Sequence, residues 1–265
     1  MNGRRFRTSL LMQLREYRAR ALPLVMVALI PMGWWAVNFF SVPAEAEPVL
    51  PPELESFAAG IGPLVWPDPL EGNIWAMFSL LTGVAWAMGA AALFSVIGSG
   101  SRDRRLMLAG FHPREIMLAR FLILLSIAIP VSLIPVVIIA GLSTLPPPNI
   151  GLVWLGLFFT AAVGAAIGLI VGSLLPRPLE GTILLIAIFS VEFSIPSSVP
   201  LRHYLPLYGP QAVFLAGRLT YEPILLIHVL RSLAWGVGLL AIAIVLWTWR
   251  VRIFQPSTAR RPAGA

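Results

Sequence analysis

The sequence predicts an all-α polytopic membrane protein with six transmembrane helices. Hydrophobic residues make up 58% of the chain and charged residues only 12%, and a soluble domain could not bury that much apolar surface. The apolar residues form six runs, at 21–40, 74–97, 121–142, 150–175, 181–195 and 224–249. Five of these runs hold about 20 residues or more, enough to cross a hydrocarbon core roughly 30 Å thick as a helix.

The distribution of arginine predicts the orientation of these spans. All 19 basic residues are arginine, and 16 of them lie within 1–20, within the gaps 98–120 and 176–180, or after residue 249. The gap at 41–73 instead holds six acidic residues and no basic residue. Because basic residues stay on the cytoplasmic side, we expect a multi-pass protein of the inner (cytoplasmic) membrane with both termini in the cytoplasm.

Residues 1–20 have the pattern of an amphipathic helix. Phe6, Leu10, Leu14 and Tyr17 recur at three- and four-residue spacing, which places them on one face of a basic helix. Such a helix lies in the headgroup plane of a membrane. The alternatives are a plain basic flank and a cleaved signal peptide, although the first apolar run is longer than the usual signal core of about 7–15 residues. The predicted organisation is an interfacial helix, one six-span domain and a disordered cytoplasmic tail, at residues 1–20, 21–254 and 255–265.

The fifth apolar run predicts a broken element rather than a simple span. It has only about 15 residues, too few to cross a membrane at 1.5 Å per residue. In the proline-rich segment 196–223 that follows, Gly209-Pro210 can begin a helix, because proline suits the first helical position. We expect a short helix, an irregular turn near the outer leaflet, and an outer helix that dips toward lipid at 212–219. Irregular backbone at that depth is buried in protein or lines a cavity, so this segment is expected to border the translocation pathway.

Ladders of small residues predict close helix packing in two of the runs. In the fourth run they are Gly156, Thr160, Gly164, Gly168 and Gly172. In the second run they are Ser79, Gly83, Ala87, Ala91 and Ser95. Small side chains let helix backbones approach closely in lipid. We expect packing within the chain, with packing against a second subunit as the alternative.

Several chemistries are excluded by the residues that the chain lacks. Without cysteine there is no disulfide, thiol catalysis or cysteine-ligated metal, and three widely spaced histidines do not predict a metal site. Without lysine the chain cannot carry the Gly-Lys-Ser/Thr loop that ordinary ATPases use to hold phosphates. The net charge of +7 is spread over several cytoplasmic gaps, so it does not predict nucleic-acid binding. If ATP drives this protein, another polypeptide binds it.

The few ionisable residues inside the apolar runs are candidates for the translocation path. Glu192 and Arg231 fall at similar estimated depths, so we expect them to pair, with His228 one turn from Arg231. The alternative is that Arg231 snorkels to the interface while Glu192 lies in a wet outer vestibule. A proton- or sodium-coupled carrier places several ionisable residues in its spans. Their scarcity here favours an external source of energy.

The gap between the second and third runs predicts a docking loop for a cytoplasmic protein. Its charged stretch 102–105 is expected to be solvated, 106–108 to form a short apolar helical turn, and 110–113 to form a corner. Glu115 then lies in the first turn of the next helix, where an acid favours the helix dipole. The residues expected to contact the partner are Arg102, Asp103, Arg104, Arg105, Leu106, Leu108, Phe111, His112, Pro113, Arg114 and Glu115.

The loop and the layout together resemble the permease subunits of type-2 ABC transporters. From Arg104 to Ile116, two arginines, an apolar stretch, a glycine, a proline corner and Arg-Glu-Ile follow the order of the coupling segment in that family. The N-terminal interfacial helix, the six spans and the broken element between spans five and six are also similar. The segment 205–210 resembles the proline-containing segment before the last span. One difference is Asp103, because the family often has a glutamate before the arginines.

This resemblance implies an ATP-driven pump of two permease subunits and two ATP-binding subunits. ATP and Mg²⁺ would then be bound by the ATP-binding cassette subunit, and this chain would bind no cofactor, hold no catalytic residue and not be an enzyme. Residues 102–115 would press into a groove on the ATPase and transmit its closure. The substrates of such exporters are amphiphiles, such as lipids, drugs, antibiotics or peptides. The other expected partners are a second permease subunit, identical or homologous, and membrane lipid.

Three alternative functions remain open at this point. A related permease could protect a producer against a membrane-active peptide. An intramembrane serine hydrolase could use Ser190 or Ser194 with His228, although no Gly-x-Ser-x-Gly signature surrounds either serine. A non-transporting membrane scaffold is the third.

Overall fold

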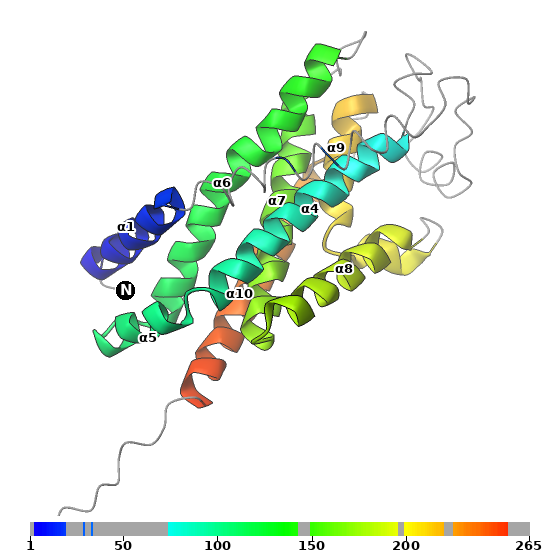
Figure 1. Cartoon of the computed structure of the whole chain (residues 1–265). Helices are drawn as coiled ribbons and strands as arrows, with labels where there is room; N and C mark the ends of the chain where they lie inside the picture. The colour runs from blue at the N-terminus through cyan, green and yellow to red at the C-terminus, as the bar shows by residue number, and fades with distance from the viewer. Residues whose placement is uncertain are drawn as a thin grey trace, which may run out of the picture.

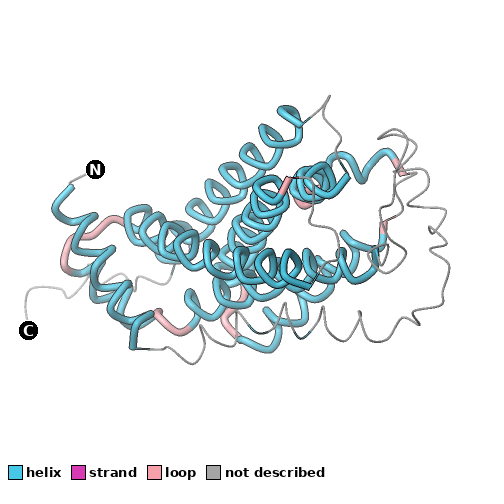
Figure 2. Tube along the Cα trace, turned by 90° about the horizontal axis from the view of Figure 1, so that it is seen from above, coloured by secondary structure: helices cyan, strands magenta, loops and turns pink. Residues whose placement is uncertain are grey.

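Helix α7 (Ile150–Leu174) lies at the centre of the protein, and the other long helices pack around it (Figure 1). The computed structural model describes residues 3–19, 29, 33, 74–142, 149–195, 199–219 and 225–253. The other helices are α1 (Gly3–Ala19), α4 (Ile74–Ile97), α5 (Gly100–Leu108), α6 (Pro113–Leu142), α8 (Pro178–Ser194), the 3₁₀ turn η1 (Pro200–Tyr204), α9 (Tyr208–Leu219) and α10 (Leu225–Ile253). Within this described part the chain is helical and contains no strand, as Figure 2 shows.

Four of the described helices are long and apolar enough to cross a membrane. Their apolar stretches are Leu80–Ile97, Pro113–Val137, Ile150–Leu174 and Leu225–Val251. The first predicted span, 21–40, lies outside the described residues except for Leu29 and Gly33. The fifth predicted span is α8, a helix of only 17 residues. The all-helical class is therefore confirmed for the described residues, with four candidate membrane-spanning helices.

The glycine ladder of α7 packs within the chain. A Cβ added to Gly164 would lie 2.6 Å from the carbonyl oxygen of Ala85 on α4, and one added to Gly168 would clash with the carbonyl oxygen of Gly89. A Cβ on Gly156 would meet the backbone of Phe214 on α9. The intramolecular prediction is thus confirmed for α7. On α4, Gly83 and Ala87 of the predicted ladder are buried and Ala91 packs against the core, which agrees with packing within the chain. The α4 residues that approach the α7 glycines most closely are Ala85 and Gly89.

Two equally apolar helices differ sharply in burial. The apolar stretches of α7 and α10 both have a mean hydropathy of 2.2, yet 83% of the first and 17% of the second is buried within the protein. Much of α10 therefore presents an apolar outer face, which is expected of a helix that contacts lipid.

The predicted broken element is present between α8 and α10. Helix α8 ends at Ser194, η1 makes a single turn, and α9 begins at Tyr208, one residue before the predicted Gly209-Pro210 start. The Arg202 side chain ties this segment together by donating to the Ile195 carbonyl at 3.0 Å and to Gln211 Oε1 at 3.3 Å. Residues 211–217 are all buried, and α9 packs on α7. Over 211–217 this helix is covered by protein, and its dip toward lipid stays a prediction.

Helix α1 confirms the predicted N-terminal helix and lies against α6. Gln13 is buried and donates from Nε2 to the Ile116 carbonyl at 3.0 Å. Phe6, Leu10 and Leu14 are half-buried, in agreement with the predicted apolar stripe. Its position in the headgroup plane stays a prediction, and the expected tail at 255–265 lies outside the described residues.

Candidate functional site

Helix α5 forms an elbow between α4 and α6, at the position of the predicted docking loop (Figure 1). Gly110 ends this helix in the left-handed region, with φ of 88°, which glycine adopts without steric cost. The Phe111 N–H donates to the Leu106 carbonyl at 3.0 Å and the Gly110 N–H to the Met107 carbonyl at 2.9 Å, as in a glycine-terminated helix. Helix α6 then begins at Pro113. The predicted corner at 110–113 is confirmed.

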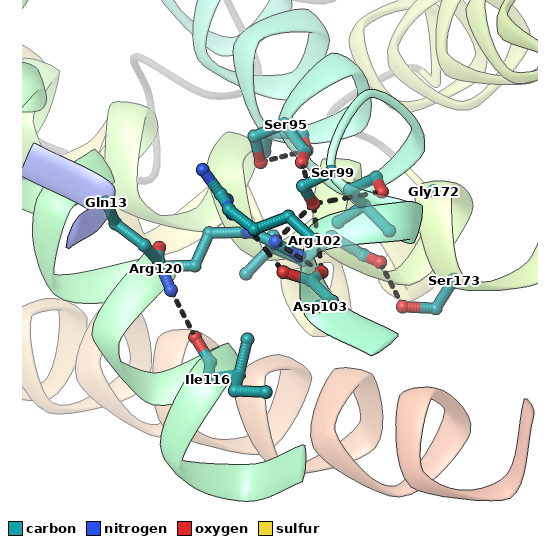
Figure 3. Close-up of polar contacts among 12 residues, drawn as sticks. Gln13, Ser95, Ser99, Arg102, Asp103, Ile116, Arg120, Gly172 and Ser173 are labelled. Atoms are coloured by element: carbon teal, nitrogen blue, oxygen red, sulfur yellow. Dashed lines mark hydrogen bonds and ion pairs between the residues drawn. The ribbon is translucent and has the colours of Figure 1, made fainter. Parts of the chain in front are cut away.

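A buried ion pair holds the elbow onto the bundle. Asp103 on α5 and Arg120 on α6 approach to 2.7 Å between Oδ2 and Nη2, and each side chain is only 1% exposed. Ser99 joins them: its hydroxyl accepts from the Arg120 guanidinium and lies 2.9 Å from Asp103 Oδ2 (Figure 3). We call Ser99, Asp103 and Arg120 the elbow knot. These ionic and hydrogen-bonded contacts offset much of the cost of burying the two charges, while Asp103 Oδ1 and Arg120 Nη1 are buried without a hydrogen bond among the described residues.

The predicted solvation of 102–105 is wrong in part. Asp103 and Glu115 are fully buried, Leu106 is 7% exposed and Arg102 is half-buried. Asp103 turns inward because α6 supplies Arg120, and the Glu115 carboxylate accepts from the His112 N–H at 3.3 Å at the start of α6. Burial lowers the pKa of Arg102, and the neighbouring Asp103 carboxylate opposes that shift. Asp103, Leu106 and Glu115 thus position the elbow from inside and do not form its outer surface.

The rest of the predicted docking set lies on the outer surface of the elbow. Leu108 is 81% exposed, more than any other large apolar side chain that the structure describes. The exposed members, which we call the elbow face, are Arg104, Arg105, Leu108, His112 and Arg114. Phe111 and Pro113 are half-buried beside them. This face combines one prominent apolar side chain with basic and imidazole groups.

The elbow knot continues into two further spans. The Arg120 guanidinium lies 5.8 Å from the ring centroid of Trp247 on α10, and Arg250 lies 5.9 Å from the same ring. Arg250 in turn donates to the carbonyls of Gly172 and Ser173 at 2.7 and 3.2 Å, which caps the last turn of α7. The sequence analysis did not identify this continuation, because Trp247 and Arg250 lie more than 100 residues beyond the loop in the sequence. The elbow is thereby linked to α6, α10 and α7.

The three predicted translocation residues converge at the start of α9, at the other end of the bundle. Glu192 is 5% exposed and accepts a hydrogen bond from the Leu207 N–H. The Arg231 guanidinium lies 5.7 Å from the ring centroid of Tyr208, and the His228 ring lies 5.7 Å from the same ring in an edge-on arrangement.

The predicted pairing of Glu192 with Arg231 is wrong. No ion pair joins them among the described residues. The start of α9 lies between the two: its backbone supplies the donor for the carboxylate, and the Tyr208 ring supplies the partner for the guanidinium. The similar estimated membrane depths of Glu192 and Arg231 do not bring their side chains into contact.

The residues of the hydrolase alternative do not form a dyad in the described structure. Ser190 is exposed on α8 and no hydrogen bond connects it with His228. The side chain of Ser194 lies outside the described residues. The His228 ring instead contacts Tyr208.

A scan of the chain against protein-family models finds no match, and a search of curated proteins finds none either.

Proposed function

We propose that this chain is the membrane-spanning permease subunit of an ATP-driven exporter of the type-2 ABC kind, with ATP hydrolysed by a separate subunit. The elbow is the observation that carries the proposal. It is a short helix fixed from inside by a buried ion pair, and its outer face presents Leu108, 81% exposed, among basic side chains. A helix so placed can receive a push from a partner and pass it to the helices to which it is bonded.

The internal contacts favour transmission of such a push. A displacement of α5 reaches α6 through Asp103 and Arg120, and reaches α10 through the stacking of Arg120 on Trp247. It reaches the end of α7 through the two hydrogen bonds of Arg250. Tightly packed elements move as units, because close-packed interiors transmit strain rather than absorb it. The elbow would therefore act on three spans at once.

The composition supports a division of labour between subunits. The chain has no lysine for a phosphate-binding loop and few ionisable residues for ion coupling. In this proposal the chain has six spans, with 21–40 as the first and α8 as a short fifth, and both termini in the cytoplasm. It works in the cytoplasmic membrane with a second permease subunit, identical or homologous. Its substrate is an amphiphile such as a lipid, drug, antibiotic or peptide.

Affinity purification from the native host tests this proposal. The variant Leu108→Asp places a charge at the centre of the elbow face without touching the buried residues, since Leu108 is 81% exposed. The matched control is Leu201→Asp, which makes the same change in η1 at a side chain 59% exposed. We expect an ATP-binding cassette protein to co-purify with the native chain and with Leu201→Asp, and to be lost with Leu108→Asp. Absence of any such protein from the native sample, or equal recovery with both variants, would overturn the proposal.

A further inference from the structure

A cluster of aromatic and cationic side chains lies at the end of the bundle opposite the elbow. The Tyr208 ring is flanked edge-on by His203 at 4.7 Å and by His228 at 5.7 Å between ring centroids. The Arg231 guanidinium lies over the same ring at 5.7 Å. We call these four residues the Tyr208 cluster. They come from η1, α9 and α10.

Gly209 is the reason that these elements meet so closely. A Cβ at this position would lie 2.7 Å from the hydroxyl of Ser232 and 3.0 Å from the carbonyl oxygen of His228. The start of α9 therefore rests directly on the backbone of α10, which brings Tyr208 level with His228 and Arg231. Close packing between the backbones of α9 and α10 therefore determines the positions of the residues in the cluster.

The cluster carries unused donors and a surplus of positive charge. Arg231 makes no hydrogen bond or ion pair with the described residues, and the Nδ1 atom of His228 is buried without a partner among them. Glu192, whose carboxylate lies at the start of α9, is already engaged by the Leu207 N–H, and it is faced by Arg202 as well. A guanidinium presents a planar fork of donors that matches the oxygens of a phosphate.

The length of α10 places the cluster at the level of lipid headgroups. Trp249, which is 62% exposed near the end of α10, marks one membrane interface, as tryptophans in spans commonly do. A hydrocarbon core of roughly 30 Å corresponds to about 20 residues at 1.5 Å per residue. Counting back from Trp249 by that length reaches the turn that contains His228 and Arg231. The donors therefore lie where the phosphates of a bilayer lie.

We propose that the Tyr208 cluster binds the phosphate of an amphiphile's headgroup at this interface. Arg231 supplies the charge and the fork of donors, the two histidines supply further ring nitrogens, and Tyr208 holds the guanidinium in place. If the chain is an exporter as proposed above, this identifies the substrate class as a phosphate-bearing lipid-like molecule. Binding itself requires no ATPase, so it can be tested whether or not the proposed function holds.

Native mass spectrometry of the full chain in detergent tests the site. The probe is dioleoylphosphatidylglycerol, and dioleoylglycerol, which has the same acyl chains and no phosphate, is the comparison lipid. We expect one tightly retained phospholipid on the native chain and none of the comparison lipid. The double change Arg231→Gln and His228→Gln should weaken retention roughly tenfold or more, because it removes a charge-assisted contact. Arg104→Gln removes one exposed charge on the elbow face and should leave retention unchanged.

Two further arms separate the possible outcomes. Arg231→Lys keeps the charge but loses the planar fork, so retention should fall to an intermediate value; this variant also serves if the double variant does not fold. Added inorganic phosphate should not displace the lipid, since the acyl chains contribute to binding. Displacement by free phosphate would show a soluble-anion site and overturn the proposal. Equal retention by the native chain and the double variant would also overturn it.

Discussion

The two ends of the helix bundle handle buried charge in opposite ways. In the elbow knot an acid, a base and a hydroxyl bond to one another, and the two charged side chains are each 1% exposed. In the Tyr208 cluster the base is half-buried, its partner is an aromatic ring, and the nearby acid is taken by a backbone N–H. The first arrangement is closed to outside partners and the second is open to them.

This difference indicates that the elbow knot holds helices together, whereas the Tyr208 cluster is available to bind another molecule. The buried ion pair fixes the position of two helices, although Asp103 Oδ1 and Arg120 Nη1 make no hydrogen bond among the described residues. Removal of either member leaves an uncompensated charge. A cation over a ring is stabilised only weakly, at about 0.5–1 kcal/mol where solvent reaches it, and it keeps its donors for another molecule. Substitutions should therefore cost most stability at the elbow knot and least at exposed positions.

The largest loss is expected for Asp103→Ala. It leaves Arg120 buried without its carboxylate, so the free energy of unfolding in mixed micelles should fall by about 3–5 kcal/mol. The control is Glu180→Ala, which breaks the exposed Arg177–Glu180 pair and should cost about 0–1 kcal/mol. The combined change of Asp103→Leu with Arg120→Met should recover most of the loss. Similar small effects of Asp103→Ala and Glu180→Ala would contradict the proposed role of the knot.

A smaller loss is expected for Glu192→Ala at the opposite end. It removes the acceptor of the Leu207 N–H, and an unpaired buried donor costs about 1–3 kcal/mol. Glu192→Gln keeps an acceptor oxygen and should cost less. Hydrogen exchange across 207–211 should quicken in Glu192→Ala while exchange in α5 stays the same. Faster exchange in α5 would show that the two ends are not independent.

Arg231→Gln should cost still less stability, about 0.5–1 kcal/mol, because only the contact with the Tyr208 ring is lost. Thermal unfolding of the purified chain measures this, with Tyr208→Leu as the matched change on the other side of the contact. If the cation–ring contact is the shared interaction, the double variant should be less than additive. A loss for Arg231→Gln as large as that for Asp103→Ala would remove the contrast between the two ends.

Leu108→Ser should have almost no effect on stability. Its side chain is 81% exposed, and surface substitutions usually lie within about 0.5 kcal/mol of the native value. Leu106→Ser, two residues away, should destabilise the protein because Leu106 is 7% exposed. Equal melting temperatures for the two variants would show that the elbow does not pack as described.

The corner that ends the elbow could be predicted from the sequence, but the side of α5 that faces the bundle could not. Gly110 and Pro113 determine the end of one helix and the start of the next, so the corner was predictable from the residues within it. Asp103 was expected to be solvated because it lies in the charged stretch 102–105. Its actual partner, Arg120, lies 17 residues further on a different helix, and no local pattern reports that contact.

Hydropathy likewise predicted spans without predicting their neighbours. The apolar stretches of α7 and α10 have the same mean hydropathy, 2.2, although one is central and the other peripheral. The signal that did separate them was the glycine ladder of α7, because glycines at period four permit close approach. The pairing of Glu192 with Arg231 failed for a related reason: depth along a helix says nothing about which element lies between two side chains.

Site-directed crosslinking from the elbow face tests the central claim most directly. The chain has no cysteine, so Leu108→Cys and Leu201→Cys each introduce a single thiol for a photo-crosslinking maleimide, one on the elbow and one in η1. The account predicts that the probe at 108, and not the probe at 201, crosslinks in native membranes to an ATP-binding cassette protein, and that the yield changes when ATP is added. Crosslinks at 108 to lipid alone, or to the same proteins as at 201, would contradict the elbow's role as the docking element.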